Sequence, residues 1–212
     1  MNFNHFAKYY DLSSRFHFGR NYTLFREKTV KAAEFQKYQT ILEFGCGTSL
    51  TLEHILESRN YNGVYLGCDI SMPMLLYAKS KFLNNPHAKA YHIQISKQGQ
   101  LPFKSASMDA IFSTLVFHLI DKQTRLFIFQ EFKRLLKPNG KVFLNEFGRP
   151  VTRMALMSKW YVLHFWALLM KAEKNSKDLF DGKFIDELEL VFSKAVCLNK
   201  SKGLIDHIVV EP

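Results

Sequence analysis

Two glycines and an acid in the first third of the chain could hold a ligand together. Gly45 and Gly47 flank Cys46 directly after the apolar run TILEF, and Asp69 ends the next apolar run about 20 residues later. Glycine has no Cβ, so a Gly-x-Gly turn lets the backbone approach a ligand closely. A carboxylate at the end of the second strand can accept hydrogen bonds from ribose hydroxyls. The spacing indicates a nucleoside-containing ligand, although the glycines alone would also suit a tight turn.

The neighbouring residues narrow the choice of ligand. A dinucleotide site would want a third glycine where Leu50 stands, and no Gly-Lys-Ser/Thr follows for a P-loop. The remaining common ligand of such a turn is S-adenosylmethionine. Its ribose suits Asp69, and its amino-acid tail and sulfonium are compatible with an acid such as Glu43.

Strand-like and helix-like runs alternate along the chain. Ser71 is the expected N-cap of one helix, with Pro73 in its first turn. The alternation predicts right-handed βαβ units, and a polar, Gly-containing turn within 194–210 predicts a final hairpin. The expected fold is α/β, a doubly wound, mostly parallel seven-stranded sheet with a C-terminal antiparallel hairpin. The strands expected before the hairpin are 40–44, 63–69, 88–95, 108–114 and 141–147, and the helices between them are 50–59, 71–84 and 121–137.

Four motifs, in order, resemble those of class I S-adenosylmethionine-dependent methyltransferases. They are LEFGCGTS, LGCDISMPML, LPFKSASMDAIFSTLVFHLID and EFKRLLKPNGKVFLNEF, and the match covers roughly residues 40–148 plus the terminal hairpin. Within that class, YYDLSSRFHFGRNYTLFRE and NEFGRP resemble segments of the ubiquinone/menaquinone-biosynthesis C-methyltransferases and the related phospholipid N-methyltransferases. The resemblance implies a Rossmann-like methyltransferase fold, S-adenosylmethionine as the cofactor and methyl transfer as the activity.

The resemblance also implies a division of the chain and a set of cofactor contacts. The division is a single domain, 1–212, made of an N-terminal helical lid (1–38), a cofactor-binding core (39–148), a helical substrate insertion (149–190) and the terminal hairpin (191–212). The contacts carried over are Glu43, Gly45, Cys46, Gly47, Asp69, Ile70, Met74, Gln98 and Ser113. Lys97 stands about where the family often has an acid for the adenine amino group. A charged lysine cannot accept a hydrogen bond, so Gln98 and backbone groups would hold the adenine.

Two residues are candidates for the chemistry. His118 follows the fourth strand, where the loop faces the methyl group in this fold, and is the candidate general base. Tyr10 would cover the cofactor if the N-terminal helix closes as a lid. The alternatives are a polar helix entry for His118 and aromatic packing for Tyr10. The segment VFHLI replaces the Arg-Asn pair that the quinone C-methyltransferases carry there, and no spacing typical of a metal site occurs.

The composition bears on partners and location. The chain has 212 residues, a net charge of +10 and three well-separated cysteines. The charge favours an anionic partner or simply Lys-rich helix faces, and the sparse cysteines favour a reducing, cytoplasmic compartment. The start of the chain lacks the pattern of a secretory signal. Aromatic residues mixed with cations in 149–177 suit the interface of an anionic membrane, while a helix packed over the sheet is the alternative.

We therefore expect methyl transfer to a hydrophobic small molecule or lipid, either a quinone precursor or a phospholipid headgroup, with peripheral contact at the inner face of the membrane. An RNA or DNA methyltransferase is one alternative. The chain has neither an Asn/Asp-Pro-Pro-Tyr motif nor a Pro-Cys pair, which argues against it. A non-catalytic partner protein of the same fold is the other alternative. The sequence indicates no oligomeric state.

Overall fold

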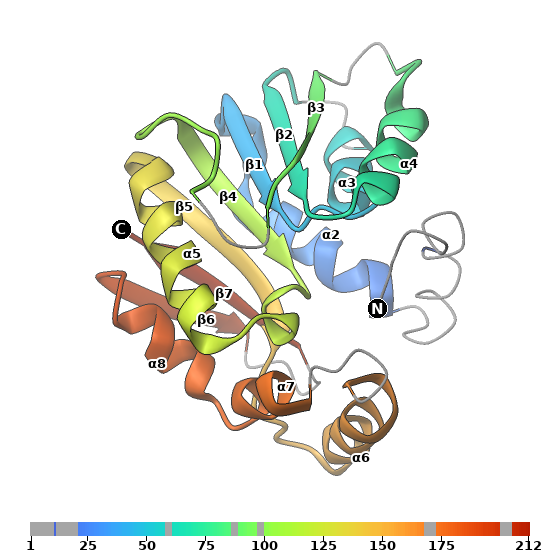
Figure 1. Ribbon diagram of the computed structural model, residues 1–212, viewed down its shortest axis with the longest axis vertical. Coiled ribbons are helices and arrows are strands. Elements are labelled where there is room, and N and C mark those ends of the chain that lie inside the picture. Colours follow the sequence, from blue (N-terminus) through green and yellow to red (C-terminus); the bar gives the residue numbers. More distant parts are fainter. Residues whose placement is uncertain are drawn as a thin grey trace.

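The protein is described by a computed structural model (Figure 1). The described residues are 11, 21–57, 61–85, 89–96, 100–167, 173–199 and 205–212. Tyr10, Lys97 and Gln98 lie outside them, so their predicted roles stay predictions.

A seven-stranded sheet forms the centre of the molecule, in the order β3-β2-β1-β4-β5-β7-β6 (Figure 1). The strands from β1 to β5 pair in parallel, whereas β7 is antiparallel to both β5 and β6. The predicted doubly wound sheet with its terminal hairpin is therefore confirmed. The strands are β1 Thr40–Phe44, β2 Val64–Asp69, β3 Ala90–Gln94, β4 Met108–Thr114, β5 Leu136–Phe147, β6 Lys194–Asn199 and β7 Ile205–Glu211.

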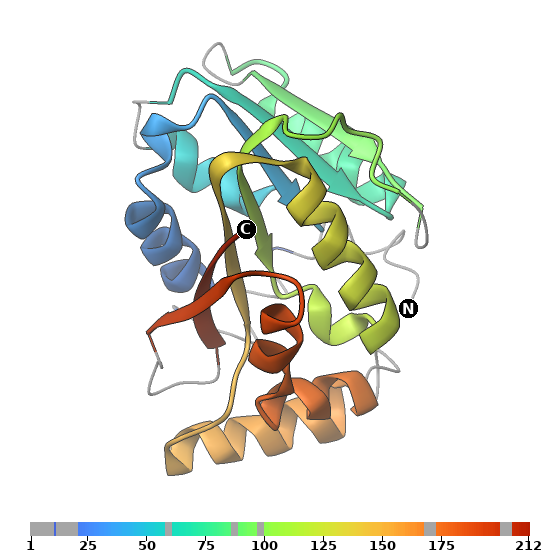
Figure 2. The ribbon, with the colours of Figure 1, turned by 90° about the vertical axis from the view of Figure 1, so that its left-hand side faces the viewer.

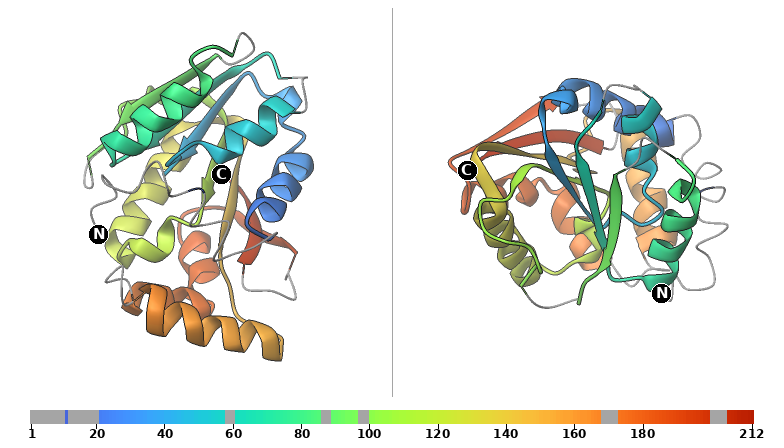
Figure 3. Two further views of the ribbon diagram at one scale, coloured as in Figure 1. Left: turned by 90° about the vertical axis from the view of Figure 1, so that its right-hand side faces the viewer. Right: turned by 90° about the horizontal axis from the view of Figure 1, so that it is seen from above.

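Helices cover both faces of the sheet (Figure 3). On one face lie α2 (Asn21–Ala33), α3 (Leu50–Glu57) and α4 (Met72–Phe82), and on the other lie α5 (Lys122–Leu135) and α8 (Lys183–Glu189). Each face has its own apolar core, and the neighbours Ile41 and Leu42 of β1 point into different cores while both are fully buried. This two-sided burial explains why the inner strands read as continuous apolar runs.

The turn PNG differs from its prediction. We expected the fifth strand to begin after this turn, at Lys141, but β5 already begins at Leu136. Met108 pairs with Leu136 and Ala110 with Lys141, so the intervening residues of β5 bulge out of the ladder. Pro138 has no N–H to give to a ladder, and Asn139 adopts a positive φ of 69°, which asparagine tolerates.

The chain leaves β5 to form a helical segment beyond the sheet. This segment contains α6 (Arg153–Tyr161), which continues as the π-helical turn η4 (Val162–Ala167), and α7 (Glu173–Phe180). α6 and η4 run along the lower end of the molecule (Figure 2). Within the described parts of the chain, no helix combines the length and the apolar character needed to cross a membrane.

Candidate active site

The glycine turn joins β1 to α3 at the carboxyl edge of the sheet. Gly45 and Gly47 have φ values of 67° and 52°, in the left-handed region that favours glycine. The N–H groups of Gly45 and Cys46 both donate to the carbonyl oxygen of Cys68 (2.8 and 3.0 Å), which fixes the turn against β2. A Cβ on Gly45 would collide with the side chain of Val116, whereas a Cβ on Gly47 would meet no atom within 4 Å. The turn is therefore closed at Gly45 and open at Gly47.

Asp69 lies at the end of β2, beside this opening. Its Oδ2 accepts a hydrogen bond from the N–H of Gly47 (2.9 Å), and its Oδ1 accepts one from the N–H of Ser71 (2.8 Å). Burial raises the pKa of Asp69, and these backbone donors oppose the rise. Ile70, the next residue, exposes its apolar side chain. An acid and an apolar side chain thus stand together beside the open side of the turn, and their contacts with a cofactor stay predictions.

Glu43 lies beneath the glycine turn. Its side chain is buried and accepts hydrogen bonds from Thr51 Oγ1 (2.5 Å) and from the hydroxyl of Tyr65. Burial raises the pKa of Glu43 to about 7, and the two hydrogen bonds oppose the rise. Glu43 therefore links β1 to α3 and β2 in this structure, and its contact with a cofactor stays a prediction.

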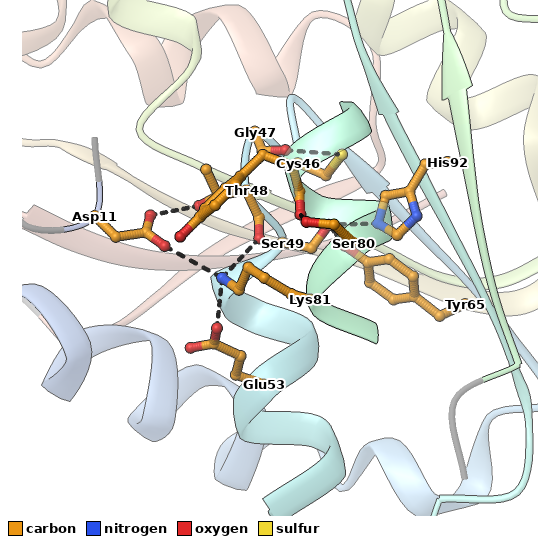
Figure 4. Close-up of polar contacts among 11 residues, drawn as sticks. Asp11, Cys46, Gly47, Thr48, Ser49, Glu53, Tyr65, Ser80, Lys81 and His92 are labelled. Carbon is orange, nitrogen blue, oxygen red and sulfur yellow. Dashed lines mark hydrogen bonds and ion pairs between the residues drawn. The ribbon is translucent and has the colours of Figure 1, made fainter. Parts of the chain in front are cut away.

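A polar network continues from Tyr65 to the edge of the sheet (Figure 4). The Tyr65 hydroxyl oxygen, whose proton goes to Glu43, lies 3.3 Å from Ser49 Oγ, which lies 2.8 Å from His92 Nε2. Burial, with help from Lys79 and Lys81, lowers the pKa of His92 to about 4. The imidazole under the turn is therefore neutral at physiological pH.

Lys81 ties α4 to the glycine turn and to Asp11 (Figure 4). Its Nζ donates to the carbonyl oxygen of Thr48 (3.0 Å) and forms ion pairs with Glu53 (2.5 Å) and Asp11 (3.2 Å). Thr48 Oγ1 donates to the other carboxylate oxygen of Asp11 at 2.5 Å. Asp11 belongs to the predicted lid segment, so one described residue of that segment touches the glycine turn.

The loop after β4 holds His118 against β5. Leu115 has a positive φ of 54°, and its N–H donates to the carbonyl oxygen of Asn145 (2.8 Å). This sharp turn leads into the 3₁₀ turn η3 (Phe117–Leu119), which carries His118. A left-handed conformation at a residue other than glycine costs about 1–3 kcal/mol and is common at functional sites.

Glu146 of β5 anchors that loop. Its Oε2 accepts from the N–H of Phe117 (2.7 Å), and its Oε1 accepts from the N–H of Phe147 (2.9 Å) and from Nδ1 of His118 (3.0 Å). Glu146 is 0% exposed, and the His118 ring packs on that of Phe147 with 4.8 Å between centroids. A buried carboxylate bound to one imidazole nitrogen sets the tautomer and orientation of the ring. This role of Glu146 was not predicted from the sequence, although an acid near the end of the apolar strand that pairs with β4 was a signal for it.

The remaining predicted residues are buried around the same edge. Ser113 pairs with Phe44 at the ends of β4 and β1, and Met74 and Cys46 are buried beside the turn. The hydroxyls of Ser113 and Ser71 are buried and have no hydrogen-bond partner among the described residues. Ser71 occupies the N-cap position of α4, as predicted, but its hydroxyl makes no capping bond.

These features fit S-adenosylmethionine. Open space borders Gly47, a carboxylate and an exposed apolar side chain stand beside it, and two buried hydroxyls need partners. A buried hydroxyl without a partner is costly, so a polar ligand there would be favourable. Asp69 would hold the ribose, Ile70 and Met74 would pack on the adenine, and the backbone of the glycine turn would take the amino-acid tail.

Comparison with known proteins supports a methyltransferase and its cofactor. A family profile described as "Methyltransferase domain" matches residues 42–144. The demethylmenaquinone methyltransferase of Lactococcus lactis is 26% identical over 200 residues, covering 88% of this chain and 77% of that protein. A tRNA N(3)-cytidine methyltransferase of Danio rerio is 26% identical over 176 residues, covering 77% of this chain and 50% of that protein. Among solved structures, an S-adenosylmethionine-dependent methyltransferase from Aquifex aeolicus aligns with a TM-score of 0.63 and 18% identity, covering 96% of this chain and 95% of that one.

The similar proteins share their reaction class and differ in their acceptors. The family profile and the relatives support an enzyme over a non-catalytic partner protein. The structural alignment shows the fold. One named relative acts on a quinone precursor and the other on tRNA, so the names alone do not fix the acceptor.

Proposed function

We propose that this chain, whose residues 42–144 match a methyltransferase-domain profile, is an S-adenosylmethionine-dependent enzyme that methylates a hydrophobic small molecule or lipid. A quinone precursor or a phospholipid headgroup is the acceptor we favour. The observation that carries the proposal is the His118–Glu146 pair beside the glycine turn, because it offers a base for an acidic hydroxyl. The similarity to a demethylmenaquinone methyltransferase over most of the chain supports the acceptor class.

The cofactor supplies, when bound, a methyl group activated by a positively charged sulfur. The chain then has to bind the acceptor, orient it towards that methyl group and exclude water from the site. Asp69, Ile70, Met74 and the glycine turn would serve the cofactor, and Gln98 stays a predicted adenine contact. Tyr10 stays a predicted cover for the same site.

His118 would act as the general base. Its Nδ1–H donates to Glu146, which leaves Nε2 as the unprotonated nitrogen. Nε2 would take the proton of an acceptor hydroxyl, which increases the electron density on that oxygen and on the ring carbons beside it. The buried carboxylate of Glu146 stabilises the imidazolium that forms. Both O- and C-methylation of a phenolic acceptor are served by this step.

An acceptor of this kind resides in a lipid bilayer. We therefore propose a cytoplasmic enzyme that works at the inner face of the membrane. A tRNA acceptor is the second candidate, favoured by the Danio rerio relative and by the net charge of +10.

The test is methyl transfer from labelled cofactor to three acceptors, namely a demethylated quinol, phosphatidylethanolamine and unfractionated tRNA. We expect labelling of the quinol or the phospholipid, lost in Asp69→Ala and lowered about 10²-fold or more in His118→Ala. His54→Ala is the matched control, because His54 lies on α3, within hydrogen-bond distance of Glu57 (3.2 Å). Labelling of tRNA alone would refute the proposed acceptor.

A further inference from the structure

The outward face of α6 exposes large apolar side chains. Met154, Met157, Trp160 and Tyr161 are 78%, 74%, 57% and 43% exposed. Their spacing of three, three and one residues puts them on one side of the helix. Isolated exposed apolar residues are common on proteins, but a contiguous row marks an interaction surface. We call these four residues the α6 face.

The opposite side of the helix is anchored to the body of the protein. Ala155 and Val162 are buried there. Lys159 forms an ion pair with Asp181 (3.2 Å), and its Nζ lies 5.5 Å from the centre of the Phe180 ring. The α6 face is thus presented outward by a helix whose rotation is fixed by these contacts.

The charged residues of the segment that contains the α6 face all have one sign. Residues 149–172 contain four Lys or Arg and no Asp or Glu. Arg149 and Arg153 are exposed at the start of α6, while the charge of Lys159 is paired inward. An anionic surface would therefore be attracted to this side of the molecule.

We propose that the α6 face docks the enzyme onto an anionic lipid bilayer. Tryptophan and tyrosine have apolar rings with a polar tip and favour the headgroup level, and flexible methionines fill the adjoining acyl layer. Exposed arginines beside them would bind lipid phosphates. A second copy of this chain is a poorer occupant, because it carries the same +10 charge and would be repelled.

A series of ring contacts joins the candidate base to the anchored side of α6. The Phe147 ring lies 4.8 Å from the His118 ring and 4.8 Å from the Phe180 ring, centre to centre. Lys159 Nζ of α6 lies 5.5 Å from the centre of the Phe180 ring. Two aromatic rings therefore lie between His118 and the anchored side of α6, and α6 lies at the end of the molecule to which β5 leads (Figure 2). The inference rests on the proposed function only in one respect, since the docked bilayer would be the source of a lipid acceptor.

The experiment is co-sedimentation of the full chain with vesicles of phosphatidylcholine, with and without phosphatidylglycerol. We expect binding to the anionic vesicles, weakened about tenfold in Met157→Gln/Trp160→Gln and weakened by added salt. The matched control is Leu76→Gln/Leu83→Gln, which replaces two exposed leucines at α4, and it should bind as the wild type does. Titration with S-adenosylhomocysteine should give unchanged affinity in both variants, which shows that they are folded.

Each result bears on docking separately from catalysis. Equal vesicle binding by the α6 variant and the control would overturn the proposal, as would wild-type binding that ignores phosphatidylglycerol. A concentration-dependent dimer that the α6 variant abolishes, without vesicle binding, would assign the face to a second copy instead. Methylation of a detergent-solubilised acceptor without vesicle binding would leave the proposed function standing and remove docking. Vesicle binding without methylation of quinol or phospholipid would leave docking standing and refute the proposed function.

Discussion

Replacing Glu146 by glutamine should disable His118 while changing little else. The substitution keeps the size of the side chain and turns one acceptor oxygen into a donor. All three groups that bind Glu146 are donors, namely the N–H groups of Phe117 and Phe147 and Nδ1 of His118, at 2.7 to 3.0 Å. The glutamine amide therefore has to face a donor in either orientation.

The two orientations have different costs. If the amide nitrogen takes the place of Oε2, it opposes the N–H of Phe117. If it takes the place of Oε1, the N–H of Phe147 loses its acceptor and His118 must change tautomer, which places its proton on Nε2. A buried donor without a partner costs about 1–3 kcal/mol in stability. In the second orientation a protonated Nε2 cannot accept a proton, and in both orientations the carboxylate that stabilises the imidazolium is lost, so we expect kcat to fall by about 10²-fold, or about 2.7 kcal/mol of barrier.

The assay is steady-state kinetics of wild type, Glu146→Gln, His118→Ala and the double variant on the labelled acceptor. If Glu146 acts through His118, Glu146→Gln should lower kcat little further in a chain that already carries His118→Ala. Glu187→Gln is the matched control, because Glu187 is also a buried carboxylate and holds Arg125 through two hydrogen bonds of 2.6 Å. That control should lose stability and keep kcat. A fall in kcat of equal size in the presence and absence of His118 would refute the reasoning, as would a folded Glu146→Gln enzyme of normal activity.

Three further predictions concern the cofactor side. Asp69→Ala should weaken S-adenosylhomocysteine binding about tenfold or more in calorimetry, whereas Asp109→Ala, which also removes two hydrogen bonds to backbone N–H groups, should not. Gly45→Ala should lower the midpoint of thermal unfolding more than Gly47→Ala, because only the former collides with Val116, while Gly47→Ala should impair cofactor binding. Burial raises the pKa of Glu43 from 4.5 to about 7, so this carboxyl binds more protons in the folded than in the unfolded state and its contribution to stability falls by roughly 3 kcal/mol as pH rises through that window, while the lowered pKa of His92 acts in the opposite direction. Glu43→Gln should remove the contribution of Glu43 to the pH slope in denaturant titrations across the window, and a slope equal to that of the wild type would contradict it.

Local patterns were enough to predict the doubly wound sheet with its terminal hairpin and the glycine turn with its acid. Gly45, Gly47 and Asp69 are read from sequence because each satisfies a backbone or hydrogen-bonding need within one βαβ unit. The role of Glu146 was not predicted because its partners His118 and Phe117 are 28 and 29 residues away and meet it only once β4 and β5 pair. The bulge in β5 was not predicted because PNG is equally suited to a turn between two elements and to an unpaired segment within one strand.

The loop after β4 couples the cofactor site to the base. Leu115 turns sharply at a positive φ, which sets Val116 against Gly45 and sends the next residues to Glu146. A change that displaces this loop should affect both contacts together, because Val116 beside Gly45 and Phe117 bound to Glu146 are adjacent residues. The strain at Leu115 is therefore tolerated at the point where cofactor binding and proton transfer must be aligned. It follows that a substitution of Val116 should alter both cofactor affinity and the rate of transfer, although Val116 itself carries no chemistry.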